Sequence, residues 1–148
     1  MNFHAKFSKI RENDVFLVSF PKSGNTWLRF LIGNYLYGNV DFSNVDDLVP
    51  DIHICGRKHL QQMKGQRFIK SHFPFNPNYP KVIYIKRNIK DVLISYFFWY
   101  KKVDPLKFKK FDRFFDLFVE NGVGPFGTWL DHVNNWIYKA KDRQGLFP

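Results

Sequence analysis

The chain has 148 residues, of which 45% are hydrophobic and 20% aromatic, and its formal net charge is +10. So many apolar residues exclude disorder as the overall state, and a chain of this length can bury a sizeable core. We therefore expect a single domain over residues 1–148. The positive charge favours an anionic partner, such as nucleic acid, anionic lipid or a multiply charged small ligand.

Cys55 is the only cysteine, so no internal disulfide can form. This suits a reducing compartment, and we expect Cys55 to be an inert thiol. Residues 1–7 contain no apolar block of signal-peptide length, and no segment approaches the ~20 apolar residues of a membrane span. We expect a soluble, cytoplasmic protein.

The first predicted element is a buried strand over residues 14–20, which leads through a short turn into a helix over 26–37. In the turn, Gly24 lets the backbone bend close to a ligand, and Lys22 supplies a positive charge. The unpaired N–H groups at the helix N-terminus favour a phosphate-like anion. This segment therefore predicts an anion-binding loop, with an ordinary strand-to-helix turn as the alternative.

The residue order differs from that of the usual nucleoside-triphosphate loop. That loop needs two glycines four residues apart, followed by Lys and then Ser or Thr, whereas here Lys22 precedes Gly24. The predicted strand over 14–20 is also not followed by a Gly-x-Gly-x-x-Gly fingerprint, so nothing specific in this turn indicates a dinucleotide fold.

The predicted helix over 26–37 carries apolar residues at helical spacing, which we expect on its buried face. They are Trp27, Leu28, Leu31, Ile32, Tyr35 and Leu36. Residues 40–65 have a weak pattern with several aspartates, which predicts loops with short turns, a place where substrate-facing variation can occur.

A second strand is predicted over residues 67–72 and a third over 81–86. Lys70 and His72 alternate at the end of the second strand, so both side chains leave the same face. Open α/β sheets bind ligands at this edge, where a neutral imidazole can accept the proton of a hydroxyl nucleophile. The alternative is that His72 is a loop histidine bonded to backbone.

Residues 87–95 repeat the pattern of strand, basic turn and helix start. Arg87 can hold a phosphate bidentately, and Ser95 can donate to the same group. A helix is predicted over residues 91–101, with Asn88 as its cap. Pairing of Arg87 with Asp91 is an equally good interpretation of this segment.

The remaining chain predicts a basic connector over 103–110 and a helix over 111–120 with a phenylalanine-rich face. A last helix is predicted over 128–141. Its expected buried residues are Trp129, Val133, Trp136, Ile137 and Ala140. Continuous apolar strands separated by helices predict an α/β fold, with a parallel sheet covered by helices on both faces. Because three strands are few for such a sheet, we expect the domain to be incomplete at its C-terminus.

Together these segments resemble the cytosolic-type sulfotransferase family, which uses 3′-phosphoadenosine 5′-phosphosulfate (PAPS) as donor. Residues 20–27 are similar to the family's 5′-phosphosulfate loop, residues 70–72 to its catalytic strand end, and residues 87–95 to its 3′-phosphate segment. Residues 127–136, with His132 and Trp136, look like a further family helix. The resemblance implies a P-loop-like sulfotransferase fold.

The resemblance also implies roles for individual residues. His72 would be the general base, Lys22 would contact the leaving phosphate, and Lys70 would assist at the sulfuryl group. The implied donor-binding residues are Lys22, Ser23, Gly24, Asn25, Thr26, Trp27, Arg87 and Ser95. No metal is implied. Asn25 stands where the family commonly has threonine, Ile89 where it often has proline, and the family's C-terminal half, with its basic loop, is missing.

The leading hypothesis is a sulfotransferase that acts by in-line displacement on a hydroxyl or amine of a small-molecule or carbohydrate acceptor, with no nucleic-acid partner and no indicated oligomeric state. One alternative is a nucleotide kinase, which the missing Gly-Lys-Ser/Thr order disfavours. Another is a non-catalytic module that binds anions or nucleic acid, which the net charge suggests.

Overall fold

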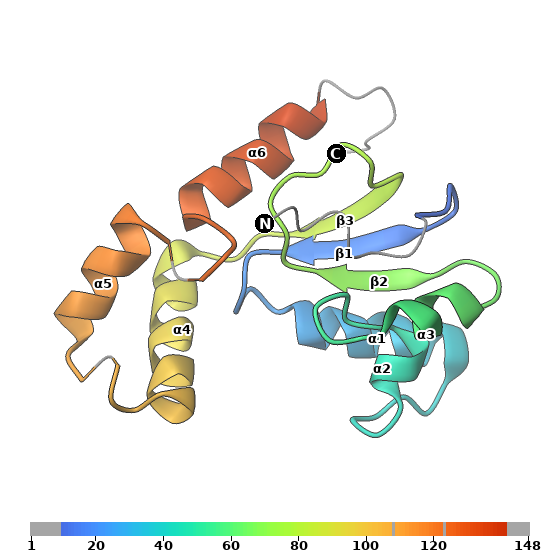
Figure 1. Ribbon diagram of the computed structural model, residues 1–148, viewed down its shortest axis with the longest axis horizontal. Helices are drawn as coiled ribbons and strands as arrows, with labels where there is room; N and C mark the ends of the chain where they lie inside the picture. The colour runs from blue at the N-terminus through green and yellow to red at the C-terminus, as the bar shows by residue number, and fades with distance from the viewer. Residues whose placement is uncertain (1–9, 108, 123, 142–148) are drawn as a thin grey trace. The chain divides into compact units, whose positions relative to one another are not determined.

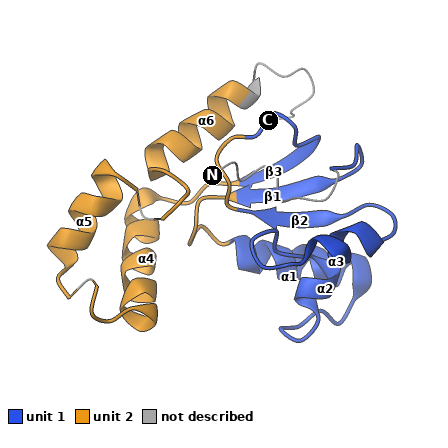
Figure 2. Ribbon diagram, in the orientation of Figure 1, with its two compact units in different colours: residues 1–18, 25–71, 76–84 blue, residues 19–24, 72–75, 85–148 orange. Residues whose placement is uncertain are grey.

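The computed structural model describes residues 10–107, 109–122 and 124–141 (Figure 1). Contacts between residues divide the chain into two compact units, which we describe separately (Figure 2). Unit 1 comprises Met1–Val18, Asn25–Ser71 and Asn76–Tyr84, and unit 2 comprises Ser19–Gly24, His72–Phe75 and Ile85–Pro148. That the chain forms one domain stays a prediction.

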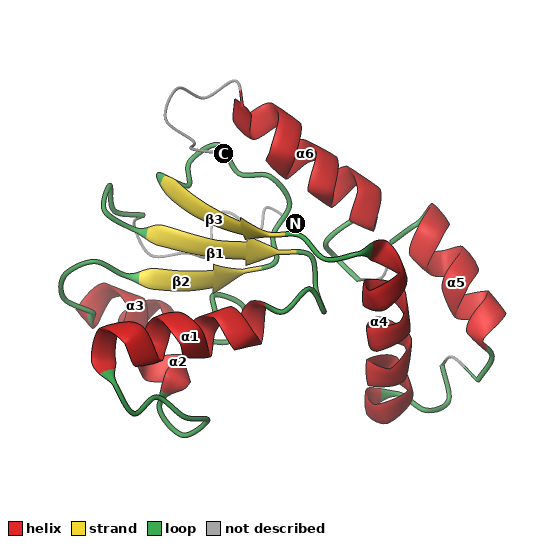
Figure 3. Ribbon diagram, turned by 180° about the vertical axis from the view of Figure 1, so that it is seen from behind, coloured by secondary structure: helices red, strands yellow, loops and turns green. Residues whose placement is uncertain are grey.

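A three-stranded sheet contains β1 (Val15–Ser19), β2 (Phe68–Ser71) and β3 (Lys81–Ile85), in the order β2-β1-β3. β1 pairs with β2 in parallel, from Val15 opposite Phe68 to Val18 opposite Ser71. The three arrows point the same way (Figure 3). All residues of the central strand β1 are buried, as its continuous apolar run predicts. The predicted parallel sheet is confirmed, and each strand differs from its predicted span only at its ends.

Three helices of unit 1 lie on one side of the sheet: α1 (Asn25–Tyr37), α2 (Val45–Leu48) and α3 (Arg57–Gln62) (Figures 1 and 3). Val15 and Leu17 of β1 form a buried cluster with Val49, against which Leu28 and Ile32 of α1 pack. The prediction of loops over residues 40–65 is wrong where α2 and α3 form. These helices are too short to show a helical period in the sequence.

The predicted buried face of α1 is only partly right. Leu28 and Ile32 are half-buried, but Trp27 is 69% and Tyr35 88% exposed, and Leu31 and Leu36 are exposed as well. The buried residues of α1 are Asn25, Arg29 and Gly33.

Arg29 is buried because its guanidinium has several partners in the next segment of unit 1. Its Nε donates to the carbonyl oxygen of Val49 at 2.8 Å, and its Nη2 to the carbonyl oxygen of Val45 and to the carboxylate of Asp46. Gly33 leaves room for Val40, whose side chain would lie 3.1 Å from an added β-carbon. These contacts account for the burial of Arg29 and Gly33, whereas Trp27 and Leu31 stay exposed.

Unit 2 contains α4 (Ile89–Val103), α5 (Phe111–Glu120) and α6 (Trp129–Lys141). The predicted cap of α4 is confirmed, since the Asn88 side chain accepts the N–H of Lys90 at 2.9 Å. α4 is longer than the predicted span of 91–101, whereas α5 has its predicted bounds. The buried core of this unit comprises Phe20, Val92, Leu93, Tyr96, Phe97, Phe114 and Phe118.

Helix α6 buries Val133 and Trp136, as predicted, and half-buries Trp129 and Ile137. The predicted burial of Ala140 falls outside the described side chains. Phe20, from the loop after β1, contacts α5 and α6 edge-on, with ring centroids 5.9 Å from Phe118 and 5.6 Å from His132. The core of unit 2 therefore anchors the start of the predicted anion-binding loop.

Candidate functional site

The loop after β1 turns sharply at two residues with positive φ, Lys22 at 68° and Gly24 at 102°. A left-handed conformation is unusual for lysine, because its β-carbon crowds the backbone there. An added β-carbon on Gly24 would have nothing within 4 Å, so the space over this backbone is open. An open, tightly turned backbone is what a phosphate cradle requires.

Ser23 lies in this loop, with only 4% of its surface exposed. Its Oγ is buried and has no hydrogen-bond partner among the described residues. A buried hydroxyl without a partner is costly, by about 1–3 kcal/mol. A ligand oxygen that hydrogen-bonded to Ser23 Oγ would remove this cost.

Arg87 joins the same loop from the end of β3. Its Nη1 donates to the carbonyl oxygen of Lys22 at 3.3 Å. Its Nε also lies 3.7 Å from Asp91 Oδ2, in an exposed pair one helical turn along α4. Arg87 therefore pairs with Asp91, as one interpretation predicts, and also contacts the predicted anion-binding loop; phosphate binding by Arg87 stays a prediction.

One residue of α4, Trp99, contacts the loop within unit 2. The Lys22 Nζ lies 5.9 Å from the ring centroid of Trp99, within the range of a cation–π contact. Ser95 is half-buried one turn earlier in the helix. The structure therefore places positive charge from two separate segments, Lys22 and Arg87, around one loop.

His72 contacts the start of this loop. Its Nδ1 lies 2.7 Å from the carbonyl oxygen of Ser19 and 3.4 Å from Ser19 Oγ. Because a carbonyl oxygen only accepts, Nδ1 carries the proton in the shorter contact, and Nε2 keeps its lone pair. The half-buried ring also contacts Phe126 edge-on, at 5.8 Å between centroids. This is the tautomer that a general base acting through Nε2 needs.

The other predicted site residues belong to unit 1. Asn25 begins α1 and is buried, with its Nδ2 donating to the carbonyl oxygen of Leu17 at 2.8 Å. Thr26 and Trp27 follow in the first turn and are exposed. The asparagine amide thus ties the start of α1 back to β1, and two exposed side chains follow it.

Lys70, also in unit 1, forms an ion pair that the sequence did not indicate. Its Nζ lies 2.6 Å from Asp51 Oδ2, and both side chains are largely buried. Asp51 Oδ1 accepts the N–H of His53 at 3.0 Å. Burial by itself raises the pKa of Asp51, but the charge and hydrogen bond of Lys70, together with the hydrogen bond from the His53 N–H, outweigh it and hold the pKa below its usual range.

His132 of α6 was noted in the sequence only within a segment that resembles a family helix, and its partners were not indicated there. It is buried in unit 2, and burial lowers its pKa to about 4. Its Nε2 lies 3.2 Å from the carbonyl oxygen of His72 and 3.1 Å from that of Phe73. Its spacing of four residues from Trp136 places the two side chains on one face of the helix, but nothing in the sequence indicates the two carbonyl oxygens as partners.

Other features of the described residues lie away from this chemistry. Burial, aided by the charge of Asp51, raises the pKa of the Cys55 thiol to about 11, which disfavours the nucleophilic thiolate. Among the described residues, no group of three His, Cys, Asp or Glu side chains is placed to hold a metal ion. No helix in the described part of the chain is long and apolar enough to cross a membrane.

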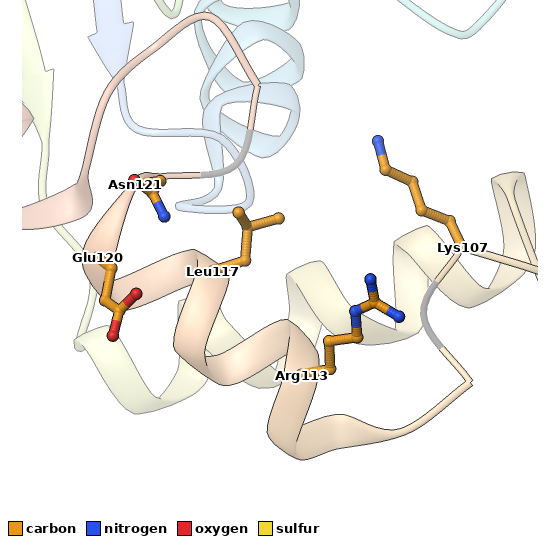
Figure 4. A pocket seen from close by; sticks show the side chains of 5 residues that line it. All are labelled: Lys107, Arg113, Leu117, Glu120 and Asn121. Atoms are coloured by element: carbon orange, nitrogen blue, oxygen red, sulfur yellow. The ribbon is translucent and has the colours of Figure 1, made fainter.

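A surface hollow of about 350 Å³ lies beside α5 in unit 2 (Figure 4). Its lining residues are Lys107, Arg113, Leu117, Glu120 and Asn121. None of the residues predicted to bind a donor lines this hollow.

Residues 12–147 match the family defined by the sulfotransferase domain. The chain belongs to this family. Sulfotransferase 1E1 of Bos taurus is 35% identical over 160 residues, and that of Rattus norvegicus 32% identical over 155 residues. Each alignment covers 93% of this chain and 52% of the relative. The chain therefore spans about half the length of the curated sulfotransferases that it matches.

Solved structures agree with this assignment. Mouse sulfotransferase SULT7A1, complexed with PAP, matches with a TM-score of 0.70 and 28% identity, over 92% of this chain and 50% of that one. A retinol dehydratase in a complex with retinol and PAP matches with a TM-score of 0.63, and at 22% identity it supports the fold alone. The predicted family and its α/β sulfotransferase fold are confirmed.

Proposed function

We propose that this protein acts in the cytoplasm as a PAPS-dependent sulfotransferase, which moves a sulfuryl group to a hydroxyl or amine of a small-molecule or carbohydrate acceptor. The family assignment and the PAP complex of the mouse relative support this proposal. The observation that carries it is the convergence, within unit 2, of three sequence-distant segments. His72 contacts Ser19 and Arg87 contacts Lys22, so both meet the loop Ser19–Gly24.

The residues of the loop fit the 5′-phosphosulfate end of PAPS. Ser23 offers a buried Oγ without a partner among the described residues, and Gly24 offers an open backbone. Lys22 supplies positive charge for the leaving phosphate. We assign further contacts at this end to Asn25, Thr26 and the start of α1, where the helix dipole favours an anion. We assign stacking on adenine to Trp27.

Arg87 and Ser95 are the residues that we assign to the 3′-phosphate. A guanidinium presents parallel N–H donors that match two phosphate oxygens, which a lysine cannot do. Arg87 is 44% exposed, so it can reach a ligand while its backbone remains fixed at the end of β3. Two phosphate-binding points on one nucleotide distinguish this donor from a simple anion.

The chemistry then depends on positioning and on charge stabilisation. When bound, the donor supplies the sulfuryl group and a phosphate as its leaving group. His72 accepts the acceptor's proton at Nε2, because its Nδ1 proton is held by the carbonyl of Ser19. Lys22 stabilises the negative charge that develops on the leaving phosphate. Lys70, held by Asp51, is assigned to the sulfuryl group.

Two variants test this proposal. His72→Ala should lower the turnover of PAPS with 1-naphthol by about a hundredfold or more, because it removes the general base. Its affinity for adenosine 3′,5′-bisphosphate, measured by calorimetry, should hardly change. Arg87→Lys should instead weaken that affinity by roughly tenfold, because it keeps the charge and loses the paired donors.

The outcomes separate the proposal from its alternatives. Failure of the unmodified protein to bind the bisphosphate would refute a sulfotransferase role. Efficient displacement of the bisphosphate by ATP with Mg²⁺ would favour a phosphotransferase. Equal loss of binding and turnover in His72→Ala would argue against a specific base role.

A further inference from the structure

Two side chains of α6 hold the backbone that carries His72. His132 and Trp136 are four residues apart, so they lie one above the other on the same face of the helix. His132 Nε2 contacts the carbonyl oxygens of His72 and Phe73, and Trp136 Nε1 donates to the carbonyl oxygen of Phe73 at 3.1 Å. All of these residues belong to unit 2.

The contacts define the protonation of His132. Both partners of Nε2 are carbonyl oxygens, which only accept hydrogen bonds, so Nε2 carries the proton. The ring is 1% exposed and packs edge-on against Phe20. Burial lowers its pKa to about 4, which keeps the imidazole neutral near pH 7. His132 is therefore a fixed neutral donor, and its ring is too enclosed to be the general base itself.

We propose that His132 is a positioning residue, which orients the imidazole of His72 by holding the backbone carbonyl of His72. This inference rests on the proposed function, in which Nε2 of His72 accepts the proton. The ring of His72 is bound at Nδ1 by the carbonyl of Ser19, and its backbone is bound by α6. With both ends held, the direction of Nε2 is set before any ligand binds, and little reorientation is needed during the reaction.

Trp136 provides the matched control. It bonds to the carbonyl oxygen of Phe73, one residue further from the imidazole of His72. Trp136→Phe removes this hydrogen bond and keeps an aromatic ring. If both residues only support packing, Trp136→Phe and a variant at position 132 without an N–H donor should lower turnover to a similar extent. If His132 positions His72, the variant at position 132 should lower turnover far more.

The test compares His132→Gln with His132→Met. The two side chains have the same length, but only glutamine places an N–H donor near the former Nε2. We expect His132→Met to lower kcat by at least tenfold at an unchanged KM for PAPS, with 1-naphthol as acceptor. His132→Gln should recover most of kcat, and Trp136→Phe should stay within about threefold of the unmodified protein.

A spectroscopic measurement does not depend on activity. Long-range ¹H–¹⁵N spectra, with His72 assigned by comparison with His72→Gln, should show the Nδ1–H tautomer in the unmodified protein and in His132→Gln. His132→Met should give a mixture of tautomers. If it does so while no variant turns over PAPS, the positioning inference stands and the proposed function fails.

An unchanged His72 tautomer in His132→Met would overturn the inference. Circular dichroism checks that each variant folds. If His132→Met does not fold, His132→Asn takes its place, because its shorter amide cannot reach both carbonyl oxygens. The same tautomer criterion then decides the inference.

Discussion

At the scale of single residues, the buried imidazole of His132 links stability to pH. Its pKa in the folded state is about 4, against about 6.5 in an unfolded chain. Between these values the unfolded chain binds a proton that the folded chain does not. The contribution of the neutral His132 to the free energy of unfolding should therefore be complete above pH 6.5. It should be lost as the pH drops toward 4, which lowers the free energy of unfolding by up to about 3 kcal/mol.

Urea unfolding of the protein at pH 7 and at pH 4.5 measures this fall. His132→Gln removes the titrating group and keeps an N–H donor, so its loss of stability over the same interval should be smaller. Equal losses in the two proteins would show that other groups, such as Asp51 and His53, account for the pH dependence.

Sequence reasoning identified residues whose chemistry follows from their place in a local motif. Lys22, His72 and Arg87 each stand next to a strand end, and the structure brings all three to one loop. Asp51 was missed, and His132 was noted only within a segment that resembles a family helix. The importance of both comes from partners far along the chain, Lys70 and the carbonyl of His72. Nothing in the sequence near Asp51 indicates its partner.

At the scale of elements, the connection from α5 to α6 depends on Gly122. Its φ is +71°, and an added β-carbon would lie 2.0 Å from the carbonyl oxygen of Gly127. Backbone must therefore move in Gly122→Ala, and we expect a loss of more than about 3 kcal/mol in the free energy of unfolding. Chemical denaturation followed by circular dichroism measures it.

Gly124 is the control for this prediction. Its φ is +90°, but an added β-carbon would have no neighbour closer than the Tyr96 hydroxyl oxygen at 3.8 Å. Gly124→Ala should therefore cost only the conformational penalty of about 1–2 kcal/mol. Similar losses for the two variants would contradict a steric role for Gly122.

The elements differ in how far the sequence could predict them. The strands and α5 were predicted because apolar runs and periods are local properties. The buried face of α1 was predicted only in part, because a periodicity rule counts Arg29 as polar. The carbonyl oxygens that allow Arg29 to be buried, those of Val45 and Val49, belong to another segment.

At the scale of the whole molecule, the chain passes repeatedly between the two compact units (Figure 2). Unit 1 contains most of β1, and unit 2 contains the loop that follows it, so neither unit is one continuous segment. We therefore predict one cooperative transition in urea, as the expectation of a single domain requires.

Two probes check this cooperativity. Tryptophan fluorescence of Trp27→Phe reports on unit 2, where Trp99, Trp129 and Trp136 lie, and far-ultraviolet circular dichroism reports on both units. Coincident midpoints would support a single domain. Two separated transitions would show that the units unfold independently.

The left-handed backbone of Lys22 favours glycine at this position, whereas the proposed chemistry needs the charge of lysine. Glycine would adopt a φ of 68° without the crowding that a β-carbon brings, so lysine has the higher conformational energy there. In the proposed function the ammonium is indispensable, and no other natural side chain would give both relief and charge. Replacing Lys22 by glycine would thus make the protein more stable and, in the proposed function, less active. Strained residues of active sites commonly show this opposition between stability and activity.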